Sequence, residues 1–206
     1  MPNPWEEISI EDYENHMSRE NVFQLQTLNA VMKERLCDYP VKTVMILGVA
    51  GGNGLEHIDK AHTQRVYGVD VNESYLCLCK KRYPFLENVL ETIRADLTDE
   101  TINLPQADLL TADLLIEYIG CECFKRVVNK VSPQYVSCTV QVNSGEKFVS
   151  DSPYIHAFDG IYKVLHSAEE TELSSVMTQM DYKQIKRAEY PLPNGKSFVR
   201  IDFSRR

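Results

Sequence analysis

The stretch Val44–Gly54, VMILGVAGGNG, decides the fold of this chain. It begins as an apolar run and ends in glycines. A short apolar run bounded by a turn signal is typical of a buried parallel strand. The glycines turn the chain sharply and let the backbone approach a ligand closely. With a helix predicted from about Asn53 to His62, this is the strand, glycine turn and helix that open a nucleotide-binding α/β sheet.

Composition restricts the class of protein. The 206 residues suit a single domain, 1–206, in which 1–40 form an N-terminal helical segment and 41–206 a cofactor-binding α/β core. The net charge of -8 argues against a dedicated nucleic-acid binder. No apolar run approaches the roughly 20 residues of a membrane helix, and the acidic N-terminus lacks a signal-peptide core. We therefore expect a cytoplasmic protein with no membrane or nucleic-acid partner.

The cysteines predict no metal site. Two pairs, Cys77/Cys79 and Cys121/Cys123, have C-x-C spacing within stretches that favour helices. Residues two apart on a helix do not face each other, and a zinc site usually uses C-x2-C or similar spacing. Buried, reduced thiols are the favoured interpretation of all six cysteines.

Strands alternate with helices along most of the chain. Residues 1–19 have no clear period, whereas Glu20–Cys37 shows the apolar spacing of an amphipathic helix. The predicted strands are Thr43–Val49, Arg65–Val71, Val89–Ala95, Ala107–Ala112, Tyr135–Val142, Tyr182–Tyr190 and Ser197–Phe203. The last two flank Asn194-Gly195, which is a strong hairpin signal. The expected fold is a Rossmann-like, seven-stranded, mostly parallel sheet with helices on both faces and an antiparallel C-terminal hairpin.

The segment between the last parallel strand and the hairpin is less regular. Asn143–His166 has no clear period and carries several aromatic residues, and long loops of this kind are usually functional or mobile. After it, Ser167-Ala-Glu-Glu170 predicts a capping box at the start of a helix.

Three acidic residues follow predicted strands. Asp70, Asp96 and Asp113 would lie at the carboxyl edge of the sheet, where open α/β sheets bind ligands. Asp70 comes 22 residues after Gly48, a spacing that suits a carboxylate accepting both hydroxyls of an adenosine ribose. The alternative is that each acid only caps the helix that follows it.

The glycine pattern separates two cofactor classes. A nicotinamide or flavin dinucleotide requires G-x-G-x-x-G, but Ala50 and Asn53 occupy the second and third glycine positions counted from Gly48. The sequence instead fits G-x-[GA]-x-G on Gly48, Ala50 and Gly52.

These features together resemble the class I S-adenosylmethionine-dependent methyltransferases over about residues 20–206. The matching stretches are ILGVAGGNG, VYGVDVNESYL, RADLTD, ADLLTADLLIEYIG and the C-terminal hairpin. The resemblance implies S-adenosylmethionine as cofactor. The residues implied for it are the methionine-wrapping Gly48, Val49, Ala50, Gly51 and Gly52, the ribose acceptor Asp70, the adenine contacts Val71, Asp96 and Leu97, and the sulfonium neighbours Asp113 and Leu114. One departure is Ile46, since the family usually has an acid two residues before the first glycine.

Methyl transfer from a sulfonium is an in-line displacement, so the protein mainly positions and desolvates the reactants. A hydroxyl nucleophile would benefit from a general base. His156, in the aromatic loop, is the first candidate, followed by Glu117, Asp113 and His16, and a structural role is the alternative for each. The stretch ADLLIEY carries no Asn/Asp-Pro-Pro-Tyr/Phe signature of exocyclic-amine nucleic-acid methylation, which together with the acidic charge argues against a nucleic-acid substrate. By analogy with the family, the absence of a large inserted domain suggests a small-molecule acceptor, and a protein side chain is the alternative.

Two other functions stay open. One is a protein of the same fold that holds the cofactor without efficient turnover, which Ile46 motivates. The other is a nicotinamide-dependent oxidoreductase, which Asn53 and the terminal hairpin disfavour.

Overall fold

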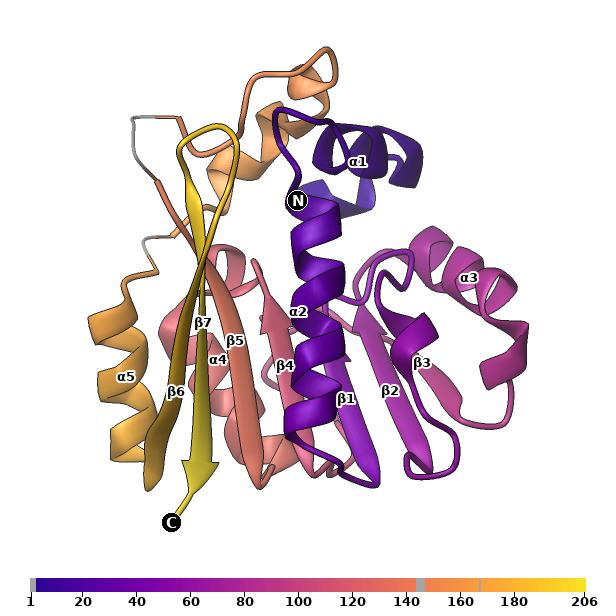
Figure 1. The fold of residues 1–206 in the computed structure, drawn as a ribbon, viewed down its shortest axis with the longest axis vertical. Helices are drawn as coiled ribbons and strands as arrows, with labels where there is room; N and C mark the ends of the chain where they lie inside the picture. The colour runs from indigo at the N-terminus through magenta and orange to yellow at the C-terminus, as the bar shows by residue number, and fades with distance from the viewer. Residues whose placement is uncertain (1–2, 144–146, 167) are drawn as a thin grey trace.

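Seven strands form one sheet in a computed structural model that describes residues 3–143, 147–166 and 168–206. Their order is β3-β2-β1-β4-β5-β7-β6, and β7 runs antiparallel to both of its neighbours (Figure 1). The strands are β1 Thr43–Leu47, β2 Arg65–Asp70, β3 Leu90–Arg94, β4 Leu109–Asp113, β5 Tyr135–Val142, β6 Tyr182–Pro191 and β7 Ser197–Arg205. The predicted fold class is confirmed, including the hairpin at Asn194-Gly195.

Helices cover both faces of the sheet. They are α1 Ile10–Met17, α2 Gln24–Asp38, α3 Glu73–Arg82, α4 Ile116–Val131 and α5 Glu170–Gln179. Apolar side chains of α2 and α3 pack with Val44, Ile46 and Val66 on one face, whereas α4 and α5 pack on the other. In Figure 1, α2 accordingly lies in front of β1 and β4, with α4 behind.

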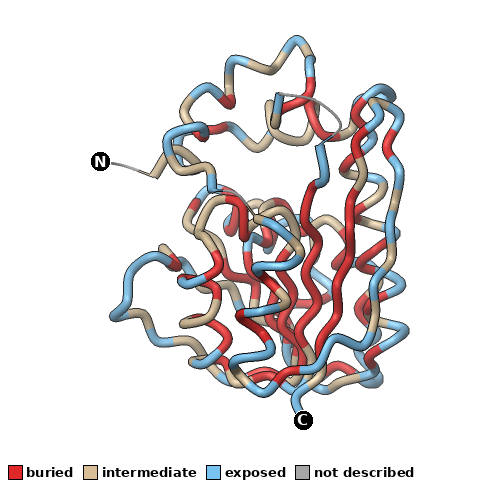
Figure 2. The backbone as a smooth tube through the Cα atoms, turned by 90° about the vertical axis from the view of Figure 1, so that its left-hand side faces the viewer, coloured by how far each residue is buried: buried red, intermediate tan, exposed pale blue. Residues whose placement is uncertain are grey.

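Strand order reverses between β1 and β4, since β2 and β3 extend the sheet to one side and β4 and β5 to the other. In open α/β sheets the ligand binds at such a switch point, beyond the carboxyl ends of the strands. Two distant segments, residues 3–17 and 148–164, lie above these ends (Figures 1 and 2). We call them the roof. Their apolar cluster includes Ile8, Val149 and Phe158.

The helix predicted for Asn53–His62 is wrong. The structure has only a 3-10 turn there, Leu55–His57. Gly54 takes a left-handed φ of 94°, and a Cβ at this residue would meet the Met32 side chain at 2.7 Å. Shortly afterwards, the Asp59 carboxylate accepts the backbone N–H of Ala61, a turn that competes with continued helix. The loop therefore packs tightly under α2 and then turns away.

Three other local expectations need correction. Residues 1–19 contain a helix, α1, whose N-cap Ser9 accepts the Asp12 N–H. Ser167 of the predicted capping box lies outside the described residues, and the N-cap of α5 is Glu169, which makes no side-chain cap. All six cysteines are free, but Cys37 and Cys77 are exposed rather than buried.

No helix of the described chain has both the length and the apolar character needed to cross a membrane. Within the same residues, no group of three or more histidine, cysteine or carboxylate side chains could hold a metal ion.

Candidate functional site

A cavity of about 600 Å³ lies between the sheet and the roof. From the sheet, Gly48, Asp70 and Asp113 line it, and from the roof Trp5 and Phe158 do so. Small-molecule sites typically measure about 300–1,000 Å³ and have mostly apolar walls with a few polar groups. The cavity thus occupies the position at which this strand order predicts a ligand.

Asp70 joins the glycine loop to the end of β2. Its Oδ2 accepts the Ala50 N–H at 2.9 Å, and its Oδ1 accepts the Asn72 N–H at 2.9 Å. These bonds hold Ala50 at a φ of 46°, a conformation that L-residues rarely adopt. Burial raises the pKa of Asp70. Each carboxylate oxygen keeps acceptor capacity beyond its one backbone bond.

Three of the residues predicted to wrap the cofactor do not line the cavity. The Val49 side chain packs against Gly68, where an added Cβ would lie 3.1 Å from the Val49 Cγ1. A Cβ on Gly51 would clash with the ion pair between Glu14 and Arg82. Gly52 faces α3, where a Cβ would come within 2.6 Å of the Tyr83 ring. These residues shape the loop from behind, while Gly48 and Ala50 border the cavity.

The predicted adenine contacts lie together over β2 and β3. Val71, Asp96 and Leu97 all line the cavity. The Asp96 Oδ1 accepts both the backbone N–H and the hydroxyl of Thr98, at 2.9 and 2.7 Å. One carboxylate oxygen of Asp96 is therefore engaged in a local turn.

Asp113 and Leu114 line the cavity at the end of β4. The fully buried Arg35 of α2 donates to both carboxylate oxygens of Asp113, at 2.7 and 2.9 Å. The same guanidinium donates to Ser137 and Thr139 of β5. Because Asp113 is held in a bidentate ion pair, its charge is already neutralised on the sheet side.

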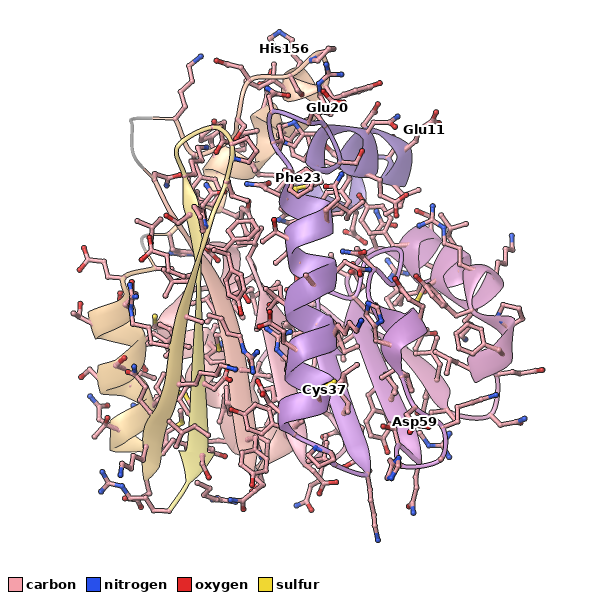
Figure 3. The ribbon with its side chains drawn as sticks, in the orientation of Figure 1. Glu11, Glu20, Phe23, Cys37, Asp59 and His156 are labelled. Carbon is pink, nitrogen blue, oxygen red and sulfur yellow. The ribbon has the colours of Figure 1, made fainter. Side chains whose placement is uncertain are left out.

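The four general-base candidates have very different positions. His156 is 88% exposed, points away from the molecule (Figure 3), and does not line the cavity. Glu117 is buried beside β5, where its Oε1 accepts the Gln141 N–H at 2.8 Å and its Oε2 has no partner among the described residues. Burial raises the pKa of Glu117 to about 7. His16 and Asp113 alone among the four line the cavity, and Asp113 is paired with Arg35.

His16 lies at the end of α1, inside the roof, and is 3% exposed. Its Nδ1 is 2.7 Å from the Ser152 Oγ, and its ring packs on Phe158 with centroids 4.7 Å apart. Burial, and then the charges of Lys196 and Arg19, lower the pKa of His16 to about 4. It is therefore an uncharged base in the cavity wall near neutral pH.

Sequence reasoning missed most of the roof. Aromatic rings of the roof form a row with rings of α3 and α4, from Tyr75 through Tyr13, Trp5 and Tyr118 to Phe148, with successive centroids 6.3, 6.2, 4.8 and 6.0 Å apart. All five line the cavity. The aromatic content of 148–162 was a signal for one part of this row. Nothing in residues 1–19 distinguished Trp5 or Tyr13.

The N-terminal part of the roof is fastened to the β2 and α3 side of the site. The Asn72 Nδ2 donates to the Trp5 carbonyl at 3.0 Å, and the Tyr75 hydroxyl donates to the Ile8 carbonyl at 2.8 Å. Arg94 pairs with Glu6 at 2.9 Å. These contacts close the cavity over Asp70 and Val71.

Comparison of the sequence with protein-family models and with curated proteins gives no match. Solved structures do match. Magnesium protoporphyrin IX methyltransferase (ChlM) from Synechocystis PCC 6803, crystallised with S-adenosylmethionine, has a TM-score of 0.67 at 12% identity, over 95% of this chain and 90% of that one. N-methyltransferase NodS from Bradyrhizobium japonicum WM9, in complex with S-adenosylhomocysteine, has a TM-score of 0.66 at 12% identity, over 95% and 97%.

The chain has the class I S-adenosylmethionine-dependent methyltransferase fold. The methyltransferase domain of bacterial CtHen1-C shares it at 20% identity, with a TM-score of 0.63 over 88% of this chain and 96% of that one. So does the [4+2]-cyclase SpnF, at 8% identity and a TM-score of 0.64, over 87% and 80%. The methyltransferase fold thus supports more than one reaction, and the function must be argued from the site.

Proposed function

We propose that this chain binds S-adenosylmethionine in the cavity and transfers its methyl group to a small-molecule acceptor. One observation carries the proposal. The glycine loop, the Asp70 carboxylate and the end of β4 border a single roofed cavity at the point where the strand order reverses. Similar structures with S-adenosylmethionine or S-adenosylhomocysteine bound support the choice of cofactor.

The residues present suit this group. The Asp70 oxygens keep acceptor capacity for ribose hydroxyls, and Val71 and Leu97 offer apolar surface for an adenine ring. The bound cofactor would supply an electrophilic methyl group on its sulfonium. The chain would orient both reactants, and the roof would exclude water. His16, uncharged and within the cavity wall, is the side chain that we propose takes a proton from a hydroxyl or amine nucleophile.

The roof also supports the choice of a small acceptor. Its two segments cover the carboxyl ends of the strands, and the remaining space is about 600 Å³. The comparison structures include enzymes described as acting on small molecules, such as geranyl diphosphate C-methyltransferase from Streptomyces coelicolor A3(2). We propose by analogy a free small molecule rather than a nucleic acid.

Calorimetric titration with S-adenosylmethionine and with S-adenosylhomocysteine tests the proposal. We expect micromolar binding of both, weakened by about 1–3 kcal/mol in Asp70→Ala because hydroxyl groups lose their acceptor. Asp59→Ala, an acid at the opposite end of the molecule (Figure 3), is the matched control and should bind normally. Absence of binding by the folded wild-type protein would contradict the proposal. A parallel titration with NADH, expected to show no binding, tests the dinucleotide alternative.

A cofactor-binding protein without efficient methyl transfer is the second candidate. Ile46 favours it, because this residue is 6% exposed within an apolar cluster and provides no carboxylate at the glycine loop. The cyclase SpnF is a precedent for the fold with another reaction. Incubation with S-adenosylmethionine and a panel of hydroxyl and amine acceptors separates the two candidates. Formation of S-adenosylhomocysteine supports transfer, whereas binding without turnover across the panel supports the second function.

A further inference from the structure

Gln24 is a polar side chain buried at the cavity wall. It is the first residue of α2 and is 5% exposed. The preceding Phe23 has a left-handed φ of 55°, and this turn brings the chain from α1 into α2. A primary amide in such a position must be hydrogen-bonded or face a ligand, because an unpaired buried amide costs free energy.

Hydrogen bonds to Gln141 fix which way the Gln24 amide points. The Gln141 Nε2 lies 2.8 Å from the Phe148 carbonyl, which can only accept, so the nitrogen of Gln141 must point to it. The Gln141 Oε1 is therefore an acceptor, and it lies 2.6 Å from the Gln24 Nε2. This relay leaves the Gln24 Oε1 on the other side, where no donor from the described residues reaches it. An acceptor with no hydrogen-bond partner among the described residues thus remains at the cavity wall.

The position of this acceptor is set by the strand order. Asp70 and Asp96 follow β2 and β3, whereas Gln24 is bonded to Gln141 near the end of β5. Strands β1 and β4 lie between them. A ligand with its ribose at Asp70 and its adenine toward Asp96 therefore extends its other end toward Gln24.

Few other groups at that end can receive a positive charge. Ile46 is apolar, and the negative charge of Asp113 is already balanced by the Arg35 guanidinium, which donates to both of its oxygens. An ammonium group has three N–H donors and needs several acceptors when it leaves water. The Gln24 Oε1 is an acceptor fixed in orientation before any ligand arrives.

We propose that the Gln24 Oε1 accepts a hydrogen bond from the ammonium group in the amino-acid half of the bound cofactor, in a chain where Ile46 replaces the usual acid. The inference rests on the proposed function, since it assumes S-adenosylmethionine in the cavity. Through Gln141, the same relay ties the cofactor's amino acid to Phe148 of the roof.

Two ligands that differ only by the amino-acid part test this assignment. S-adenosylhomocysteine carries the ammonium and carboxylate, and 5′-methylthioadenosine lacks both. In Gln24→Leu we expect S-adenosylhomocysteine to bind about 10- to 100-fold more weakly, because a hydrogen bond to a charged group is lost. Binding of 5′-methylthioadenosine should stay within twofold of wild type, which also shows that the variant is folded. Gln24→Met serves as a second variant if Gln24→Leu does not fold.

The controls separate three outcomes. Gln26→Leu, on the exposed side of the same helical turn, should bind both ligands as wild type does. Equal weakening of both ligands in Gln24→Leu, or no weakening of S-adenosylhomocysteine, would overturn the assignment of Gln24 while leaving the proposed function intact. A wild-type protein that binds neither ligand would instead contradict the proposed function itself.

Discussion

The sheet has two contrasting faces where β4, β5 and β7 lie side by side. Toward α4 and α5 it presents buried apolar side chains such as Leu110, Val136 and Ile201. Toward α2 it presents Ser137, Asp202 and other buried polar residues, which surround side chains from that helix. Apolar burial is non-directional, whereas hydrogen-bonded charges require a defined geometry.

A continuous polar network fills the α2 face. The Arg35 Nε donates to the Ser137 hydroxyl at 2.7 Å. That hydroxyl in turn donates to the Asp202 carboxylate at 2.5 Å. Arg200 donates to Asp202 and also to Asp38 of α2. Burial disfavours the charged form of Arg35, but the neighbouring Asp113 carboxylate outweighs this effect and raises the pKa of Arg35. We infer that this network fixes the position of α2, and with it the cavity residues Gln24 and Asp113, while the apolar face supplies most of the stability.

Breaking the network at Arg35 should have the largest effect. Arg35→Met leaves Asp113 without its partner, and removal of one member of a buried pair typically costs about 3–5 kcal/mol. Urea unfolding measures this loss. Arg35→Met combined with Asp113→Leu should recover most of the stability, because no uncompensated carboxylate remains. A single-variant loss below about 1 kcal/mol would show that the ion pair does not organise this face.

A cavity in the opposite face should cost slightly less. Leu110→Ala removes a fully buried side chain, for which about 2–5 kcal/mol is typical. The exposed Ile185 of β6 provides the control, since Ile185→Ala should change the unfolding free energy by no more than about 0.5 kcal/mol. If Leu110→Ala weakened S-adenosylhomocysteine binding as strongly as it weakened folding, the division between a stabilising face and a positioning face would be wrong.

This contrast also explains how far the sequence could predict the molecule. Val199, Ile201 and Phe203 alternate along β7 in the pattern of a strand with one apolar face, and all three lie in the apolar core. Arg200 and Asp202 alternate with them, yet both are fully buried under α2. A charged residue in a short stretch of sequence looks solvent-exposed unless its buried partner is known. In this network the partners are far apart along the chain: Arg35, for example, lies 102 residues from Ser137.

The candidate site shows the same pattern. The glycine loop and Asp70 were identifiable because their spacing is local and fixed by backbone geometry. The roof was not, because residues 3–17 and 148–164 meet only in the folded chain. Within α2, the apolar spacing predicted one stripe but could not reveal that Gln24 and Arg35 are buried in it.

Glu117 provides a pH-dependent test near the site. Burial raises the pKa of Glu117 to about 7. Between about pH 4.5 and pH 7, the folded state therefore keeps a proton that the unfolded chain has released. Stability from this group is full below pH 4.5 and is lost as the pH rises to about 7. Glu117→Gln should therefore gain stability relative to wild type over this window, by up to about 3 kcal/mol at pH 8. A difference independent of pH would contradict the buried, protonated carboxyl.

His16 should show the opposite slope. Its pKa is lowered to about 4, so the unfolded chain binds a proton between about pH 6.5 and 4 that the folded state resists. Wild-type stability should fall as the pH falls through that window. His16→Gln, which can keep a bond to Ser152, should flatten this part of a plot of Tm against pH. An unchanged slope would mean that His16 titrates normally and is not enclosed by the roof.

A crystal structure of the protein with S-adenosylhomocysteine is the most direct test of the account. We predict electron density in the roofed cavity, with both ribose hydroxyls within hydrogen-bond distance of the Asp70 carboxylate, adenine toward Leu97 and the amino-acid end toward Gln24. Density elsewhere on the protein, or a ligand with its adenine at the β5 end of the cavity, would contradict the account.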